Sequence, residues 1–225
     1  MLSFLGIGGA FNVNLKNCSA FYKANKKLIL IDCGESIFEE ILNKNILDDI
    51  EDLTIIITHF HSDHVGSLGS LIFYSDKINI KNVNIIYPNK KAMNDLLKIY
   101  GVTDCNYKVY NPSEYNNFFI KQYLQDHSFI EAYGYLLEFN NKRIYYSGDT
   151  KSIPEEILKE FLTGKISYFY QDVRVEENNY HLSLNKLEKY IPIEHRKEVN
   201  CMHFNTQEEM DIIKDRGFSL VKKVR

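Results

Sequence analysis

The stretch THFHSDH, residues 58–64, decides how the rest of this chain is interpreted. It holds three histidines and an aspartate, and it directly follows the apolar run LTIII at residues 53–57. Neutral imidazoles and a carboxylate are the ligands of zinc and of related first-row metals. The chain has only 7 histidines, so chance is a poor explanation for finding three of them within these seven residues. The stretch therefore predicts a metal site at the end of a buried strand.

Length and composition bound the class of protein. With 225 residues, 44% hydrophobic and 25% charged, the chain fits one globular α/β domain spanning residues 1–225. A net charge of −3 and a pI of about 6.2 argue against a bulk electrostatic grip on long nucleic acid, so no stable nucleic-acid partner is expected. No run reaches the ~18 apolar residues of a membrane helix, and no basic signal segment precedes the apolar start. We expect a cytoplasmic protein with reduced thiols and no membrane partner.

Short apolar runs alternate with helical periodicities along the chain. Strands are expected at residues 2–6, 19–22, 27–31, 55–57, 83–87, 118–124, 132–139, 142–146, 166–170 and 198–202. Helices are expected at residues 36–43, 90–100, 154–162, 184–190 and 206–216, with another after His64 that carries Val65, Leu68, Leu71 and Ile72 on one stripe. Residues 102–117 are polar and give no clear pattern. This mixture indicates the α/β class, or α+β in some schemes.

Polar side chains recur where an apolar strand ends, at Asp32, His59, His127, Asp149, Asp172 and His203. Strand ends at one edge of a sheet bring distant residues to a single rigid site. Taken singly, Asp149 could be only a helix N-cap, His127 a surface residue and His203 a satisfied buried histidine. Together with residues 58–64, they supply the roughly six ligands and one bridge that two metal ions need.

This pattern resembles the metallo-β-lactamase superfamily over nearly the whole chain. The family's pattern includes the motif HxHxDH, found here at residues 59–64. Asp32 in LIDCG precedes this motif, and His127, Asp149 in SGDT and His203 follow it in the family's order. The resemblance implies an αββα sandwich with two divalent ions at one edge, Zn²⁺ being expected and Mn²⁺ also compatible. It implies one metal on His59, His61 and His127, another on Asp63, His64 and His203, a bridging Asp149 and an orienting Asp32.

A second segment indicates the branch of the superfamily. The stretches YFYQD at 168–172 and YHLS at 180–183 resemble ribonuclease Z-like phosphodiesterases. In those enzymes an acidic residue and a histidine outside the metal ligands form a proton-transfer pair, which implies this role for Asp172 and His181. Asp172 stands where that family usually has glutamate, and Gln171 replaces the preceding histidine.

One segment of the tRNA-binding members has no counterpart here. They carry a long arm between the equivalents of His127 and Asp149, where this chain has only a tight hairpin around residues 140–141. The resemblance is therefore closest to arm-less cyclic-nucleotide phosphodiesterases such as the anti-Pycsar enzymes. Such relatives usually act as homodimers.

The implied chemistry is hydrolysis of a small anionic phosphodiester. A metal-bridging hydroxide attacks phosphorus while His181, held by Asp172, protonates the leaving oxygen, and Asp63 belongs to both the metal ligands and the catalytic group. Alternatives are a tRNA 3′-processing endonuclease, or a lactonase or thioesterase that would not need the Asp172–His181 pair. A non-enzymatic metal-binding protein would require a broken ligand set, whereas the set here is complete.

Overall fold

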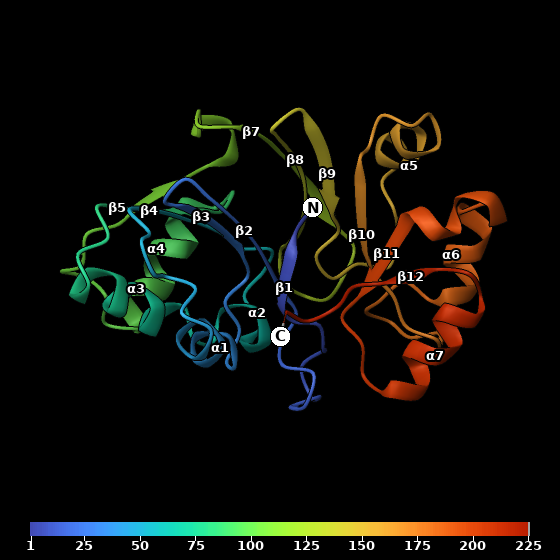
Figure 1. Cartoon of the computed structure of the whole chain (residues 1–225), viewed down its shortest axis with the longest axis horizontal. Helices are drawn as coiled ribbons and strands as arrows, with labels where there is room; N and C mark the ends of the chain where they lie inside the picture. The colour runs from blue at the N-terminus through green and yellow to red at the C-terminus, as the bar shows by residue number, and fades with distance from the viewer. Residues whose placement is uncertain (225) are drawn as a thin grey trace.

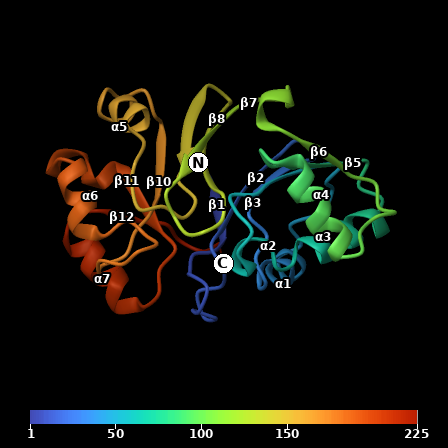
Figure 2. The ribbon, with the colours of Figure 1, turned by 180° about the vertical axis from the view of Figure 1, so that it is seen from behind.

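Two six-stranded sheets lie face to face, with helices on both outer surfaces, in a computed structural model that describes residues 1–224 (Figure 1). The first sheet has the order β1-β2-β3-β4-β5-β6, with bounds β1 Ser3–Gly6, β2 Ser19–Ala24, β3 Lys27–Ile31, β4 Asp52–Ile56, β5 Asn82–Ile86 and β6 Lys108–Tyr110. Its outer face is covered by α1 Ile37–Asn43, α3 Leu68–Lys77 and α4 Lys90–Ile99 (Figure 2).

The second sheet repeats this plan with the order β12-β11-β10-β9-β8-β7. Its strands are β7 Phe119–Gln125, β8 Ala132–Phe139, β9 Lys142–Tyr146, β10 Tyr168–Asp172, β11 Val199–Met202 and β12 Ser219–Leu220. Its outer face carries α5 Glu155–Leu162, α6 Leu184–Tyr190 and α7 Gln207–Asp215. The predicted α/β class and αββα layering are confirmed.

Parallel pairing sets the position of the site. Strands β3 to β6 run parallel in the first sheet, and β9 to β12 run parallel in the second. Parallel strands are covered on both faces, which explains the almost continuous apolar runs in β4 and β5. Chain segments that leave parallel strands do so at one edge of each sheet, so the residues that follow them can meet.

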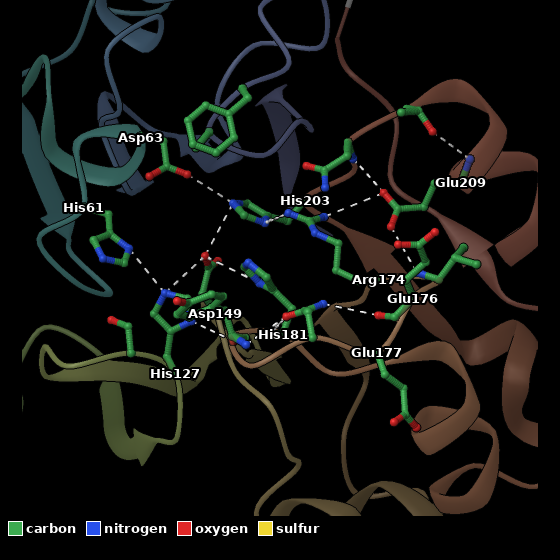
Figure 3. A pocket seen from close by; sticks show the side chains of 18 of the residues that line it. His61, Asp63, His127, Asp149, Arg174, Glu176, Glu177, His181, His203 and Glu209 are labelled. Carbon is green, nitrogen blue, oxygen red and sulfur yellow. Dashed lines mark hydrogen bonds and ion pairs between the residues drawn. The ribbon is translucent and has the colours of Figure 1, made fainter.

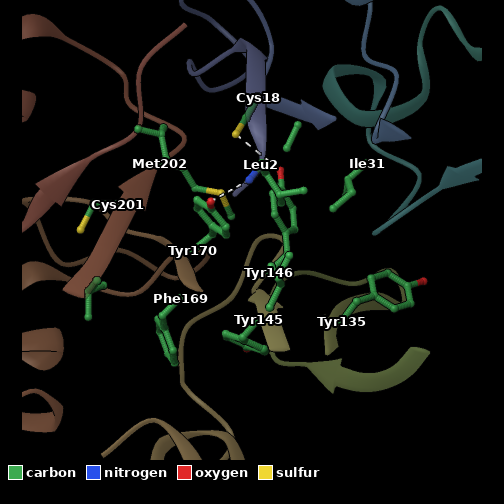
Figure 4. Close-up of a cluster of buried hydrophobic side chains, with 14 of the residues drawn as sticks. Leu2, Cys18, Ile31, Tyr135, Tyr145, Tyr146, Phe169, Tyr170, Cys201 and Met202 are labelled. Atoms are coloured by element: carbon green, nitrogen blue, oxygen red, sulfur yellow. Dashed lines mark hydrogen bonds between the residues drawn. The ribbon is translucent and has the colours of Figure 1, made fainter. Parts of the chain in front are cut away.

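The core between the sheets is rich in tyrosine, and its hydroxyls have partners (Figure 4). Tyr170 OH accepts from the backbone N–H of Leu2 at 3.0 Å, and Tyr146 OH lies 3.6 Å from Cys18 Sγ. A buried aromatic hydroxyl needs such a partner because an unpaired one is costly. The inner faces of the two sheets are thus joined by specific polar contacts as well as by apolar packing.

Several predicted elements differ from the structure, among them the strand expected at 55–57, which is β4 at Asp52–Ile56. The helix expected after His64 is two pieces, α2 Ser62–Val65 and α3, because Ser67 leaves the helical path and donates its backbone N–H to Cys33 O at 3.1 Å. The strand expected at 166–170 is displaced to Tyr168–Asp172. The patternless residues 102–117 contain β6 and a 3₁₀ turn at Pro112–Glu114. Among residues 1–224, no helix is long and apolar enough to cross a membrane.

One tyrosine ties the second sheet to the strand that leads into the HxHxDH motif. Tyr135 on β8 is fully buried, and its hydroxyl donates to the carbonyl of Ile57 at 2.8 Å. Ile57 directly precedes Thr58 and His59, so this bond fixes the backbone at the floor of the histidine cluster.

We expect Tyr135→Phe to lower the free energy of unfolding by about 1–3 kcal/mol, because the Ile57 carbonyl would remain buried without its donor. Tyr87→Phe is the matched control: its hydroxyl makes a longer bond, 3.3 Å to Glu131 O, and its loss should cost less. Denaturant unfolding of both variants measures the difference. Equal losses in the two variants would contradict this role for Tyr135.

Candidate metal centre

Side chains from both sheets converge at one edge of the sandwich (Figure 3). His61 and Asp63 come from the loop and short helix after β4, whereas His127, Asp149 and His203 follow β7, β9 and β11 of the second sheet. All the predicted site residues lie in this cluster, and most are buried: Asp32, His59, His61, Asp63, His64, His127, Asp149, Asp172, His181 and His203.

Three histidines form one side of the cluster. His59 Nε2 lies 3.0 Å from His61 Nδ1, and His127 Nε2 lies 3.3 Å from that same atom. A tetrahedral ion with metal–nitrogen bonds of about 2.0–2.1 Å separates its ligand atoms by about 3.3 Å. The spacing of these three nitrogens therefore fits the ligands of one cation.

Asp63, His64 and His203 form the other side. Asp63 Oδ2 lies 3.3 Å from the Nε2 atoms of both His64 and His203. The buried Nε2 of His64 makes no hydrogen bond, a defect that a cation would remove. This group too has the spacing and donor chemistry of a divalent-metal site.

Asp149 lies between the two groups. Its carboxylate oxygens are 3.5 Å from His64 Nε2 and from His203 Nε2, and 4.0 and 3.8 Å from the Nε2 atoms of His59 and His127. Asp149 is buried and does not cap α5, whose N-cap is Pro154. The helix-cap alternative for Asp149 is therefore wrong, and its position suits a carboxylate shared by two cations.

Asp32 holds the motif in place from behind. Its Oδ1 accepts the Thr58 backbone N–H, and its Oδ2 accepts the Thr58 hydroxyl and faces His64 Nδ1, each at 2.8 Å. Likewise His127 Nδ1 lies 2.8 Å from the carbonyl of Tyr180. When Nδ1 of an imidazole is bonded outward, Nε2 is turned toward the cluster, as a metal-binding histidine requires.

Burial and charge shift the protonation equilibria in opposite directions. Burial alone would lower the pKa of His64, but the carboxylates of Asp63, Asp149 and Asp32 raise that pKa well above its usual value. Burial also opposes protonation of His203, yet Asp149 raises its pKa to about 9. His59 behaves differently, because burial lowers its pKa well below the usual range. When no cation is bound, the surrounding carboxylates therefore favour the protonated forms of His64 and His203, whereas burial favours neutral His59.

A second pair lies beside the metal groups, on the wall of a cavity of about 1100 Å³. His181 Nδ1 is 2.7 Å from Asp172 Oδ2, and the fully buried Asp172 also accepts the backbone N–H of Thr150 at 3.1 Å. Burial would raise the pKa of Asp172, but His181 lowers it well below the usual value, so this carboxylate is ionised. The structure thus brings Asp172 and His181 into direct contact, as the sequence motif predicted.

Sequence reasoning missed Arg174. It lies two residues beyond Asp172, is 5% exposed, lines the cavity and places Nη2 2.8 Å from His203 Nδ1. Only the spacing from Asp172 could have indicated it. Asp126 and His195 lie outside the site: Asp126 pairs with Lys151 at 2.7 Å, and His195 faces Glu198 at 3.4 Å.

The profile of a protein family described as "Anti-Pycsar protein Apyc1" matches residues 1–100 and 90–225. The chain belongs to this family. Curated Apyc1 proteins include one from Bacillus phage 010DV004, 25% identical over 236 residues that cover 92% of this chain and 90% of the relative. Another, from Paenibacillus xerothermodurans, is 23% identical and covers 99% of this chain and 94% of the relative. A metal-dependent hydrolase of Pyrococcus abyssi is 26% identical over 196 residues, covering 84% and 82%.

Solved structures place the Apyc1-family chain in the metallo-β-lactamase fold. A metallo-β-lactamase fold protein of Bacillus subtilis superposes with a TM-score of 0.77 at 13% identity, covering 99% of this chain and 95% of the other. A diphosphatase of the PhnP family gives 0.76 at 18% identity, covering 100% and 95%. Human short-form tRNase Z gives 0.73 at 15% identity, covering 100% and 97%. The resemblance read from the sequence is confirmed, and the chain is a metal-dependent hydrolase.

We expect Asp32→Asn to weaken metal binding by about 10- to 100-fold, because an amide cannot replace both oxygens that Thr58 and His64 use. Asparagine tolerates the positive φ of 62° at this position, so the backbone should be kept. Competition with a chromophoric chelator measures the affinity, with Asp126→Asn as a control outside the cluster. Unchanged affinity in Asp32→Asn would show that Asp32 does not orient His64.

Metal affinity should fall as the pH is lowered. The pKa of His203 is about 9 without a cation and the pKa of His64 is also raised, so a metal ion must compete with protons for both imidazoles as the pH falls. Chelator competition between pH 6 and pH 9, together with calorimetry in buffers of different ionisation enthalpy, should show net proton release. His195→Ala should leave this pH dependence unaltered, and a flat profile in the parent protein would refute the prediction.

Proposed function

We propose that this Apyc1-family hydrolase is a phosphodiesterase that cleaves small cyclic nucleotides with two divalent ions, Zn²⁺ in preference to Mn²⁺. The observation that carries the proposal is the Asp172–His181 pair, 2.7 Å apart, on the cavity wall beside the ligand groups. A lactonase or thioesterase could use the same metal ligands, but it would have no need for this additional proton-transfer pair.

The residues fit the proposed ions by spacing and by donor type. His59, His61 and His127 would hold one ion, Asp63, His64 and His203 the other, and Asp149 would contact both. When bound, the two cations would neutralise charge on the phosphoryl oxygens and lower the pKa of the attacking water.

His181 is suited to protonate the leaving oxygen. Its Nδ1 is occupied by the ionised carboxylate of Asp172, which leaves Nε2 as the atom available to a molecule in the cavity. A carboxylate behind an imidazole fixes the ring orientation and stabilises its protonated form. Because the leaving group of a cyclic nucleotide is an alkoxide, a positioned proton donor should contribute about 10²–10⁴-fold to the rate.

The mouth of the cavity suits a compact substrate with an aromatic base. Phe11, Phe129 and Tyr180 line it, and Phe11 and Phe129 are 95% and 104% exposed. Exposed aromatic rings stack on nucleobases of any sequence. The β8–β9 hairpin connects directly through residues 140 and 141, in place of an arm that could clamp a long RNA. The homodimer expected from the resemblance stays a prediction.

We expect His181→Ala to keep its metal content and lose about 10²- to 10⁴-fold in kcat on a cyclic mononucleotide. Asp149→Ala should instead lose metal, because its carboxylate contacts both groups. His195→Ala is the matched control, a histidine outside the cavity that should change neither quantity.

Metal analysis and a substrate panel test the proposal. The panel holds cyclic mononucleotides, cyclic dinucleotides, a precursor tRNA, a lactone and a thioester. Hydrolysis of the lactone or thioester alone, or an unchanged rate in His181→Ala, would refute the proposed activity.

A further inference from the structure

Arg174 carries a buried charge that the protein does not fully neutralise. The residue is 5% exposed, and its buried Nη1 has no hydrogen-bond partner among residues 1–224. The nearest carboxylate, Glu209, lies 3.8 Å from Nη1. Both oxygens of Glu209 already accept backbone N–H groups, from Val175 at 3.0 Å and from Asn205 at 2.7 Å. A buried charged donor without an acceptor is costly, so its retention calls for an explanation.

The backbone makes room for this side chain. A Cβ on Gly9 would lie 2.6 Å from Arg174 Nη2, and Gly9 is held in place because its N–H donates to Phe204 O at 2.9 Å. The glycine-rich loop after β1 therefore admits the guanidinium to the cavity wall. Arg174 is also fixed at its own backbone, by bonds to Leu182 and Leu184 on either side of Ser183.

The charges around the cavity make Arg174 distinctive. Among residues 1–224, one lysine or arginine lines this cavity, and it is Arg174 (Figure 3). The carboxylates of Glu176, Glu177, Glu208 and Glu209 also line the cavity. An anionic group entering the cavity is repelled by these carboxylates and attracted to the position between Arg174 and the proposed metal ligands.

We propose that Arg174 is a substrate-binding residue whose guanidinium supplies hydrogen bonds to a phosphoryl oxygen. This inference rests on the proposed function, since it assigns the phosphate of the substrate to one side of the cavity. The phosphate places its negative charge beside the one lysine or arginine side chain among residues 1–224 that lines the cavity. The uncharged end of the substrate then lies toward the glutamates and the exposed aromatic rings. Arginine suits this role because its planar fork matches a phosphate in two directions.

The test measures binding of inorganic phosphate to the metal-loaded protein by titration calorimetry. Arg174→Ala should weaken this binding by about 10- to 100-fold while metal content stays the same. Arg174→Lys should recover part of the loss, because it keeps the charge without the fork. Arg216→Ala is the matched control, since Arg216 pairs with Glu188 at 2.9 Å outside the cavity and should leave phosphate affinity unchanged.

A second variant guards against misfolding. Gly9→Ala places a methyl group against Nη2 and should displace the guanidinium, so it too should weaken phosphate binding. Unchanged phosphate affinity in Arg174→Ala would overturn the inference. So would loss of metal from both Arg174 variants, because Arg174 would then act only by positioning His203. If Arg174→Ala does not fold, Arg174→Lys and Gly9→Ala decide the matter by the same criterion.

Failure of the inference is separable from failure of the proposed function. Phosphate binding is measured without turnover, whereas the function is tested with the substrate panel. If phosphate binding depends on Arg174 but no cyclic nucleotide is hydrolysed, the inference stands and the proposed substrate is wrong. Where turnover occurs, Arg174→Ala should raise KM more than it lowers kcat, which a purely structural role would not produce.

Discussion

The buried carboxylate of Asp32 is the contact on which the histidine cluster depends. It follows β3, yet it accepts the backbone and hydroxyl protons of Thr58 after β4 and faces His64 Nδ1, each at 2.8 Å. A carboxylate without exposure is tolerable only when such partners satisfy it. Asp32 thereby joins the ends of the parallel strands β3 and β4 and sets the orientation of the His64 imidazole. The other candidate ligands lie around that imidazole.

The cluster brings several buried histidines and aspartates close together, and such crowding of ionisable side chains is itself evidence of function. Asp63 and Asp149 approach the same two imidazoles within about the ligand spacing of one ion, and His59 is buried so deeply that it stays neutral. Without a cation, the nearby carboxylates raise the pKa of His64 and of His203. Packed cores avoid such a network, because each buried ionisable side chain lowers the stability of the protein unless it has a hydrogen-bond or charge partner. Divalent cations held by the two ligand groups would satisfy these side chains.

The sequence was sufficient to predict most of the cluster, for a physical reason. Ligands that follow apolar strands are visible as polar residues after short β-branched runs, and parallel pairing brings their ends to one edge. That is why His127, Asp149 and His203 could be joined to residues 59–64 across large distances in the chain. The pairing of Asp172 with His181 came from a resemblance, since nothing in local periodicity places residue 181 beside residue 172.

What the sequence could not show depends on backbone geometry and on contacts between distant segments. Asp32 and His203 adopt positive φ, 62° and 69°; Asp and His are among the residue types that tolerate this conformation, but the sequence pattern does not show which of them adopts it. The break between α2 and α3 arises from a bond between Ser67 and Cys33, on different elements. From the sequence, Arg174 is one more charged residue after a strand. Its importance depends on Gly9, far upstream in the chain, and on its being the one lysine or arginine among residues 1–224 that lines the cavity.

The distribution of charge around the cavity links these observations to substrate choice. Arg174 and the proposed metal ligands line the cavity together with Glu176, Glu177 and Glu208. A molecule with a single phosphodiester can place its charge beside Arg174 and the proposed ions and present neutral hydrogen-bond donors to the glutamates. A polyanion has no such option, because its further phosphates would face carboxylates. We therefore propose that the cavity disfavours long nucleic acid through local repulsion, independently of the net charge of the chain and of the length of the β8–β9 hairpin.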